Sequence, residues 1–188
     1  MPRWEPNARE RLMRAALTLF VERGYENTTV IDIVERAGLG KTTFFRYFRD
    51  KREVLFGGDS RPDLLATEIA SAPPSATPLE AIAAALTAAG RERFTPERRE
   101  ILALRQSVID ANPELREREA LKNLTLITSM TEALEARGVP GLTSAVTAQL
   151  GGLTIEIAFK RWIAATDTED FADLVGRTLT EVQVAAVQ

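Results

Sequence analysis

The stretch from Thr28 to Lys51, TTVIDIVERAGLGKTTFFRYFRDK, is typical of two short helices joined by a tight turn. Thr29 can cap the first helix, and Asp32, three residues later, can complete a capping box. Gly38 can adopt the left-handed backbone that such a turn needs, and a second helix is expected from Lys41 to Tyr47. This is the layout of a helix-turn-helix, so DNA binding is the first hypothesis.

The second of these helices separates an inward face from an outward face. Phe44 and Phe48 can pack inward, and Phe45 can face either inward or outward. The outward residues are cations and hydroxyls, which suit phosphates and base edges. Residues near helix N-termini can reach phosphates, because the helix dipole favours anions there. The candidate DNA contacts are Thr28, Thr29, Gly40, Lys41, Thr42, Thr43, Phe45, Arg46, Tyr47 and Lys51, of which Thr28, Thr29 and Lys51 are expected to bind phosphates.

Residues 20–56, FVERGYENTTVIDIVERAGLGKTTFFRYFRDKREVLF, resemble the N-terminal domain of the tetracycline-repressor (TetR) family of bacterial transcriptional regulators. The family's usual serine at the start of the recognition helix is Gly40 here, its usual glycine is Thr42 and its usual tyrosine is Phe45. The first two differences change what faces the groove, and the third removes a hydroxyl that commonly reaches a phosphate in the family. The matching positions are Gly24-Tyr25, Thr28-Thr29-Val30, Ala37-Gly38-Leu39, Thr43-Phe44, Tyr47-Phe48 and Lys51.

Composition agrees with this resemblance. The chain has 188 residues, of which 45% are hydrophobic, enough for a core in one large or two small domains. Residues 1–56 hold 11 basic and 8 acidic residues, whereas residues 57–188 hold 13 and 19. A basic module on an acidic body is what a phosphate-binding head joined to a different kind of domain should show.

The residue types also limit the chemistry that the chain can perform. The chain has no cysteine and no histidine, which excludes disulfides and thiolate sites and removes the commonest general base and metal ligand. We therefore expect no cofactor, no metal and no enzymatic activity. No membrane span or signal peptide was recognised, and a cytoplasmic location is expected.

Helical periodicity continues along the chain and predicts an all-α fold. The predicted organisation is a three-helix helix-turn-helix domain at residues 1–56 and a helical ligand-binding and dimerisation domain at residues 57–188. Glycine, proline and polar residues at 57–62 mark the boundary. Helices are expected at residues 7–23, 79–93, 143–165 and 168–186. A further helix is expected to begin at residues 95–97, and a long helix is expected to begin at residues 112–114 and to end at residues 137–138.

The last two helices carry apolar stripes at helical spacing. Such stripes close a subunit's own core in most proteins, but the resemblance implies that these two helices form a dimer contact, with a two-fold dimer presenting two recognition helices to DNA. The expected interface residues are Leu150, Leu153, Ile157, Leu174, Val175 and Val182. Gly151 and Gly152 would allow close helix approach.

The resemblance also implies an effector site in the body. We expect a small, mostly apolar molecule, bound by apolar side chains with a few polar groups among them. An ion pair with a neighbouring helix is the competing explanation for Arg105. The candidate pocket residues are Leu102, Arg105, Gln106, Ile127, Met130 and Phe159. The chain is thus expected to be a ligand-responsive regulator, acting as a repressor on a double-stranded operator; the alternative is a helical dimerisation or adaptor protein without an effector.

Overall fold

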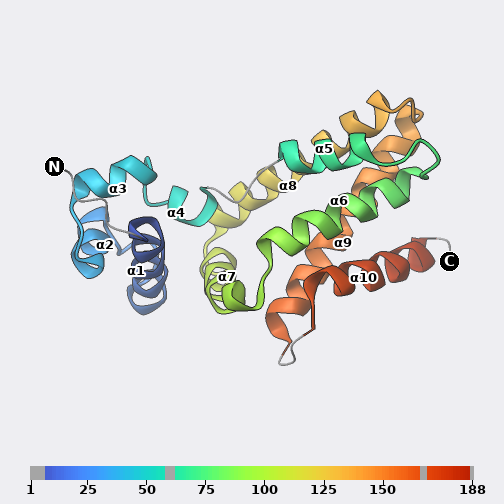
Figure 1. The fold of residues 1–188 in the computed structure, drawn as a ribbon. Helices are drawn as coiled ribbons and strands as arrows, with labels where there is room; N and C mark the ends of the chain where they lie inside the picture. Colours follow the sequence, from blue (N-terminus) through green and yellow to red (C-terminus); the bar gives the residue numbers. More distant parts are fainter. Residues whose placement is uncertain (1–6, 58–61, 166–168, 187–188) are drawn as a thin grey trace. The chain divides into compact units, whose positions relative to one another are not determined.

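The computed structural model describes residues 7–57, 62–165 and 169–186, which form ten α-helices and no β-strand (Figure 1). The predicted all-α fold is confirmed. The predicted boundary residues 58–61, and Thr168 at the predicted start of the last helix, lie outside the described residues. The helices are α1 (Ala8–Arg23), α2 (Val30–Ala37), α3 (Lys41–Tyr47), α4 (Glu53–Phe56), α5 (Pro62–Ser71), α6 (Pro78–Arg93), α7 (Pro96–Asp110), α8 (Pro113–Ala136), α9 (Gly141–Ala164) and α10 (Phe171–Ala186).

The chain forms two compact units that are not simple halves of the sequence. Unit 1 contains Met1–Asp59 together with Ile101–Glu119, and unit 2 contains Ser60–Glu100 together with Ala120–Gln188. Helices α7 and α8 therefore each contribute residues to both units. The functional division into residues 1–56 and 57–188 stays a prediction.

Local sequence explains the helix-turn-helix of unit 1. The Thr29 hydroxyl accepts a hydrogen bond from the Asp32 backbone N–H at 3.2 Å, and the Thr29 N–H donates to the Asp32 carboxylate at 2.7 Å. This is the predicted capping box, and hydrogen bonds from the Thr29 hydroxyl and N–H hold the pKa of Asp32 below its usual value. Gly38 ends α2 with φ 62°, a left-handed conformation that favours glycine.

Helix α1 lies against α2, α3 and α4 and supplies much of the core of unit 1. Large side chains from all four helices meet there and exclude water, so the short α3 is held by tertiary packing rather than by its own length. A seven-residue helix would be marginal without such support. The central core residues are Leu12, Leu19, Phe20, Ile33, Phe44, Phe48 and Leu55, each no more than 3% exposed.

Part of α7 and the start of α8 complete unit 1. Val108, Ile109 and Leu115 belong to the same buried cluster as the helix-turn-helix core. Arg105 donates through Nε to the Leu55 carbonyl oxygen at 2.6 Å, which satisfies an acceptor at the end of α4. Residues 101–119 are thus an integral part of the unit that holds the helix-turn-helix.

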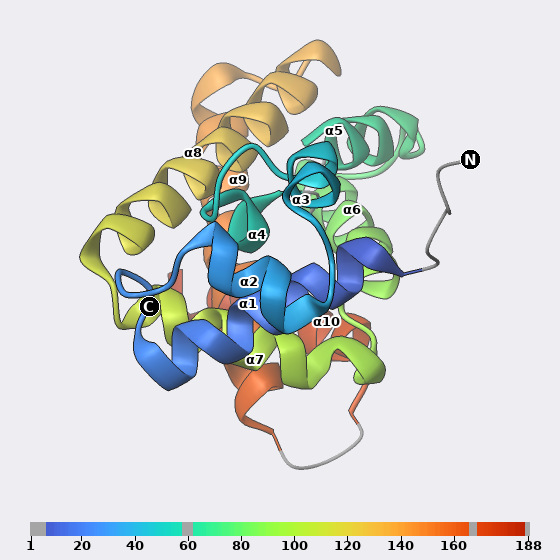
Figure 2. The same ribbon diagram turned by 90° about the vertical axis from the view of Figure 1, so that its left-hand side faces the viewer.

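In unit 2, α6 is the central helix and packs against α5, α9 and α10, with α5 beside α6 in both ribbon views (Figures 1 and 2). Glycines explain how α9 approaches its neighbours so closely. A Cβ on Gly151 would lie 2.7 Å from Ile82 Cγ2, and a Cβ on Gly152 would lie 2.8 Å from Ile127 side-chain atoms. Both glycines therefore serve close packing of helices within one subunit.

Helix α9, with 24 residues, is also long and apolar enough to cross a membrane, because an 18-residue window within it has a mean hydropathy of 1.2. This hydropathy differs from the expectation that the chain holds no membrane span. Helix α9 packs against α6 and α10, and Glu156, Lys160 and Arg161 lie in its second half. We therefore interpret α9 as a bundle helix whose high hydropathy comes partly from exposed apolar residues.

Candidate nucleic-acid interface

The outward face of α3 carries most of the predicted DNA contacts. Lys41, Thr42 and Arg46 are exposed, and Thr43 and Tyr47 are half-buried. Among the described residues, neither Lys41 nor Arg46 is paired with a carboxylate, so both cations are available to an anionic partner. Gly40 is the N-cap of α3 and makes no side-chain cap.

Phe45 belongs to this outward face and not to the core. Its side chain is 55% exposed, whereas the flanking Phe44 and Phe48 are 0% and 2% exposed. Residues 41 and 45, 42 and 45, and 42 and 46 are three or four positions apart, so neighbouring members of this set share one side of the helix. The exposed face of α3 thus combines two cations, a hydroxyl and an aromatic ring.

The two threonines expected to bind phosphates are engaged elsewhere. Thr28 is 1% exposed, and its hydroxyl donates to the Gly24 carbonyl oxygen at 2.9 Å, so the prediction that it reaches a phosphate is wrong. Thr29 is exposed, but its hydroxyl and N–H are used by the capping box with Asp32. The Asp32 carboxylate thus occupies the position at this helix N-terminus that a phosphate was predicted to take.

Lys51 was expected to bind phosphate, and the structure assigns it another role. Its Nζ donates to the carbonyl oxygens of Tyr25 at 2.7 Å, Thr28 at 3.2 Å and Glu26 at 3.4 Å, which uses the three donors of an ammonium. The ammonium also lies 4.2 Å from the centre of the Tyr25 ring. Lys51 therefore fixes the loop that enters α2, and it does so across more than twenty residues of sequence.

Arg49 is the basic residue that the sequence reasoning missed. It lies two residues after the end of α3, beyond the extended residue Phe48, and its side chain is 91% exposed. The nearest carboxylate oxygen, on Glu53, is 4.0 Å from its Nε, so the pairing is weak. The signal available in the sequence was a third cation, after Lys41 and Arg46, close to the end of the expected recognition helix.

Separate substitutions of Lys51 and Arg49 are expected to distinguish a residue that stabilises the fold from a residue that binds DNA. Lys51→Ala should lower the free energy of unfolding by about 1–3 kcal/mol, because charged hydrogen bonds to three carbonyls are lost. Arg49→Ala should change it by less than about 0.5 kcal/mol and instead weaken DNA binding. Denaturant unfolding with both variants checks this; equal stability of Lys51→Ala and the parent would contradict the assigned role.

The predicted dimer residues fall into two groups. Leu153 on α9 is 46% exposed, and Leu150 and Ile157 are half-buried on the same helix face. On α10, by contrast, Leu174, Val175 and Val182 are 5%, 0% and 7% exposed in a single chain, so they belong to the subunit's own core and the interface prediction is wrong for them. The competing explanation, that stripes close the core, holds for this part of α10.

The exposed apolar surface of α9 is longer than predicted. Leu142 and Val146 are 80% and 51% exposed and continue the stripe of Leu150, Leu153 and Ile157 at helical spacing. One turn further, Arg161 reaches α10 and pairs with Glu181 at 2.6 Å. The α9 stripe therefore ends beside the exposed side of α10.

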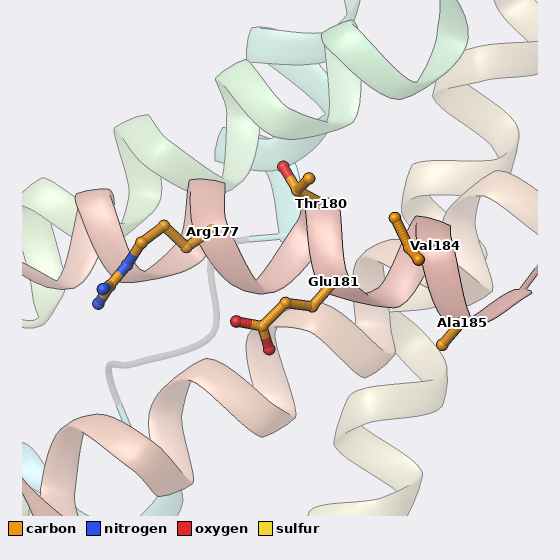
Figure 3. A pocket seen from close by; sticks show the side chains of 5 residues that line it. All are labelled: Arg177, Thr180, Glu181, Val184 and Ala185. Carbon is orange, nitrogen blue, oxygen red and sulfur yellow. The ribbon is translucent and has the colours of Figure 1, made fainter.

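That exposed side of α10 is hollowed. An open depression of about 500 Å³ lies along the helix, and Figure 3 shows the side chains spaced along it. It is a surface feature, with Val184 53% exposed, and not an enclosed ligand cavity. The lining residues are Arg177, Thr180, Glu181, Val184 and Ala185.

The six predicted pocket residues are divided between the two units. Arg105 pairs with Glu119 at 3.2 Å, and Gln106 Nε2 donates to the same carboxylate at 3.0 Å, so both polar groups are satisfied inside unit 1. The ion-pair explanation thus fits Arg105, and neither side chain is left to orient a ligand as the pocket prediction requires. Leu102 is buried in unit 1. The other three predicted residues belong to unit 2, where Ile127 lies against Gly152, Met130 against Gly151 and Phe159 against Phe94.

The aromatics of the body mostly serve packing. Phe94 stacks with Phe171 at a centroid distance of 4.2 Å and with Phe159 at 5.4 Å, while Trp162 is 1% exposed and lies 5.7 Å from Phe171. Arg99 covers the Trp162 ring at 4.8 Å. This cluster anchors the ends of α6, α9 and α10.

Within unit 1, helices α1, α2 and α3 form a three-helix arrangement of the helix-turn-helix class, in which α1 supports α2 and α3. Residues 12–56 match the model of the bacterial regulatory proteins of the tetR family. The chain is 42% identical over 89 residues to the HTH-type transcriptional regulator TcmR of Streptomyces glaucescens. This match covers 45% of the chain and 38% of TcmR, so less than half of either protein is aligned. The helix-turn-helix region, residues 12–56, therefore matches the TetR family.

Solved structures resemble the fold over nearly the whole chain. NalD of Pseudomonas aeruginosa, described as the secondary repressor of the MexAB-OprM multidrug efflux pump, has a TM-score of 0.65 at 19% identity, covering 96% of this chain and 97% of NalD. FadR of Thermus thermophilus, a TetR-family transcriptional repressor in complex with lauroyl-CoA, has a TM-score of 0.52 at 22% identity, covering 93% of each chain. At these identities the likeness shows the fold alone.

Proposed function

We propose that the chain is a transcriptional regulator that binds double-stranded DNA with α3 in the major groove. The observation that carries this proposal is the exposed face of α3, which presents Lys41, Thr42, Arg46 and, beyond the helix, Arg49. A cation can neutralise phosphates or bind guanine, and a hydroxyl can bind a base edge. No acidic residue occurs within α3 to oppose a polyanion.

The proposed binding form is a homodimer built on α9 and α10. The exposed stripe of α9, from Leu142 to Ile157, is a row of apolar side chains that a monomer would leave in water. A two-fold axis would bring this stripe against the same stripe, or the α10 depression, of a second copy. Such a dimer presents two recognition helices to half-sites about 34 Å apart, and so predicts a pseudo-palindromic operator.

The proposed regulation is release of the operator by a small, mostly apolar effector bound in the body. The lauroyl-CoA in the FadR complex and the repressor roles of FadR and NalD support this proposal by analogy of fold. Residues 101–119 suit transfer of the effector signal, because they belong to unit 1 with the helix-turn-helix. The remaining residues of α7 and α8 belong to unit 2. Regulation requires two arrangements of the DNA-binding heads, and an effector shifts their populations only if it binds one arrangement with higher affinity than the other. We propose that this occurs in the cytoplasm.

Selection from random duplexes tests the function. The purified chain should enrich a sequence with two related half-sites in inverted orientation, bound much more tightly than unselected DNA. Enrichment of no sequence above background would contradict the proposal. It would leave the adaptor alternative, which explains the exposed α9 stripe but gives no role to the basic face of α3.

A further inference from the structure

One residue of the α3 face differs chemically from its neighbours. Phe45 is 55% exposed on a surface that otherwise presents ammonium, guanidinium and hydroxyl groups. Leaving most of an aromatic ring in water forgoes the free energy that its burial would provide. Isolated exposed apolar residues are common, so exposure alone does not assign a role. The position of Phe45 within the proposed interface is what distinguishes it.

The ring of Phe45 is held from behind by the core. It packs edge-on against Phe44, with a centroid distance of 5.4 Å and an interplanar angle of 83°. Phe44 is itself fully buried and stacks on Phe48 at 5.5 Å. One edge of the Phe45 ring is therefore supported by a fixed aromatic pair, while the rest of the ring faces outward. Such a ring loses little conformational freedom when it contacts a partner.

Helical spacing directs Phe45 towards the same partner as the cations. Phe45 is four positions after Lys41 and three after Thr42, so the three side chains share one face of α3. If that face lies in the major groove, Phe45 meets base edges there. A phenyl ring neither donates nor accepts conventional hydrogen bonds, so it cannot read the polar groups of those edges. The apolar group that the major groove offers is the C5-methyl of thymine.

We propose that Phe45 is a specificity-determining residue that recognises a thymine in each half-site through its C5-methyl group. The inference rests on the proposed function and adds to it the chemistry of one recognised base. It assigns the cations of α3 to phosphates or guanine and the aromatic ring to thymine.

The test removes the methyl group without changing base pairing. In the duplex selected by the chain, each thymine is replaced singly by deoxyuridine, and dissociation constants are measured at one salt concentration. Loss of one buried methyl group is expected to weaken binding about three- to ten-fold at one thymine per half-site and to have little effect at the others.

Protein variants connect that effect to Phe45. Phe45→Ala should bind thymine and deoxyuridine duplexes equally, whereas Phe45→Tyr, which keeps the ring, should retain the preference for thymine. Val21→Ala is the matched control, because Val21 is an exposed apolar residue of α1 with 53% exposure. It should behave as the parent does in both comparisons. Circular dichroism verifies that each variant is folded.

Two results would overturn the inference while leaving DNA binding intact: no thymine of the selected duplex responds to methyl removal, or Phe45→Ala retains the full response. A selected half-site without thymine would overturn it as well. Failure of the underlying function looks different, because then no duplex is selected at all.

Discussion

Replacement of Leu153 by aspartate is expected to convert the proposed dimer into folded monomers and to abolish tight operator binding at micromolar protein concentration. Leu153 is 46% exposed in a single chain, so a carboxylate there remains hydrated in the monomer. In the dimer it would be buried in an apolar interface at a cost of several kcal/mol, and two-fold symmetry introduces the charge twice. A loss of this size raises the dimer dissociation constant by several orders of magnitude.

Light scattering and DNA titration check this expectation, and α10 supplies the contrast. Leu174→Asp places the same charge at a position that is only 5% exposed within one subunit, so it should unfold unit 2 rather than release an intact monomer. A folded, dimeric Leu153→Asp variant would show that the α9 stripe is not the interface. A parent protein that is monomeric at micromolar concentration would remove the dimer altogether.

Combined replacement of Lys41 and Arg46 by alanine is expected to lower affinity for the selected operator by at least about 100-fold. Each direct contact to a base is worth roughly 1–3 kcal/mol, and each dimer loses both side chains twice. The slope of log affinity against log salt should also decrease, by about one unit for each phosphate contact removed.

Both positions are exposed, so the double variant should remain as stable as the parent. Arg14→Ala is a suitable control, because Arg14 is an exposed cation of the head on α1, paired with Glu10. It removes a positive charge outside the proposed interface and should cost little affinity. Parent-like binding by the double variant, with an unchanged salt slope, would show that α3 is not the recognition helix.

Local signals explain why so much of the head could be predicted. The Thr29 and Asp32 capping box, the left-handed Gly38 and the start of α3 at Lys41 all depend on residues within a few positions of one another. The exposed face of α3 follows from helical spacing alone. Helix α5 was not predicted, because Pro62–Ser71 lies between two loop signals and has a short apolar pattern.

Long-range contacts account for the errors. Lys51 appears free in the sequence, but its partners are carbonyl oxygens of residues 25, 26 and 28, and nothing local to Lys51 indicates them. Arg105 appears isolated among apolar residues, although Leu55 and Glu119 satisfy it. The apolar stripe of α10 likewise does not reveal whether its partner belongs to the same subunit. These assignments depend on which helices meet, and periodicity does not specify that.

The central claim is that α3 recognises DNA through its exposed face. The most direct measurement is the ratio of affinities for the selected duplex and a scrambled duplex of equal length, determined at several salt concentrations for the parent and for the Lys41 and Arg46 double variant. The parent should prefer the selected duplex by a factor of about 10³ or more, and the double variant should lose most of that preference. Equal affinity of the parent for the two duplexes would contradict the account.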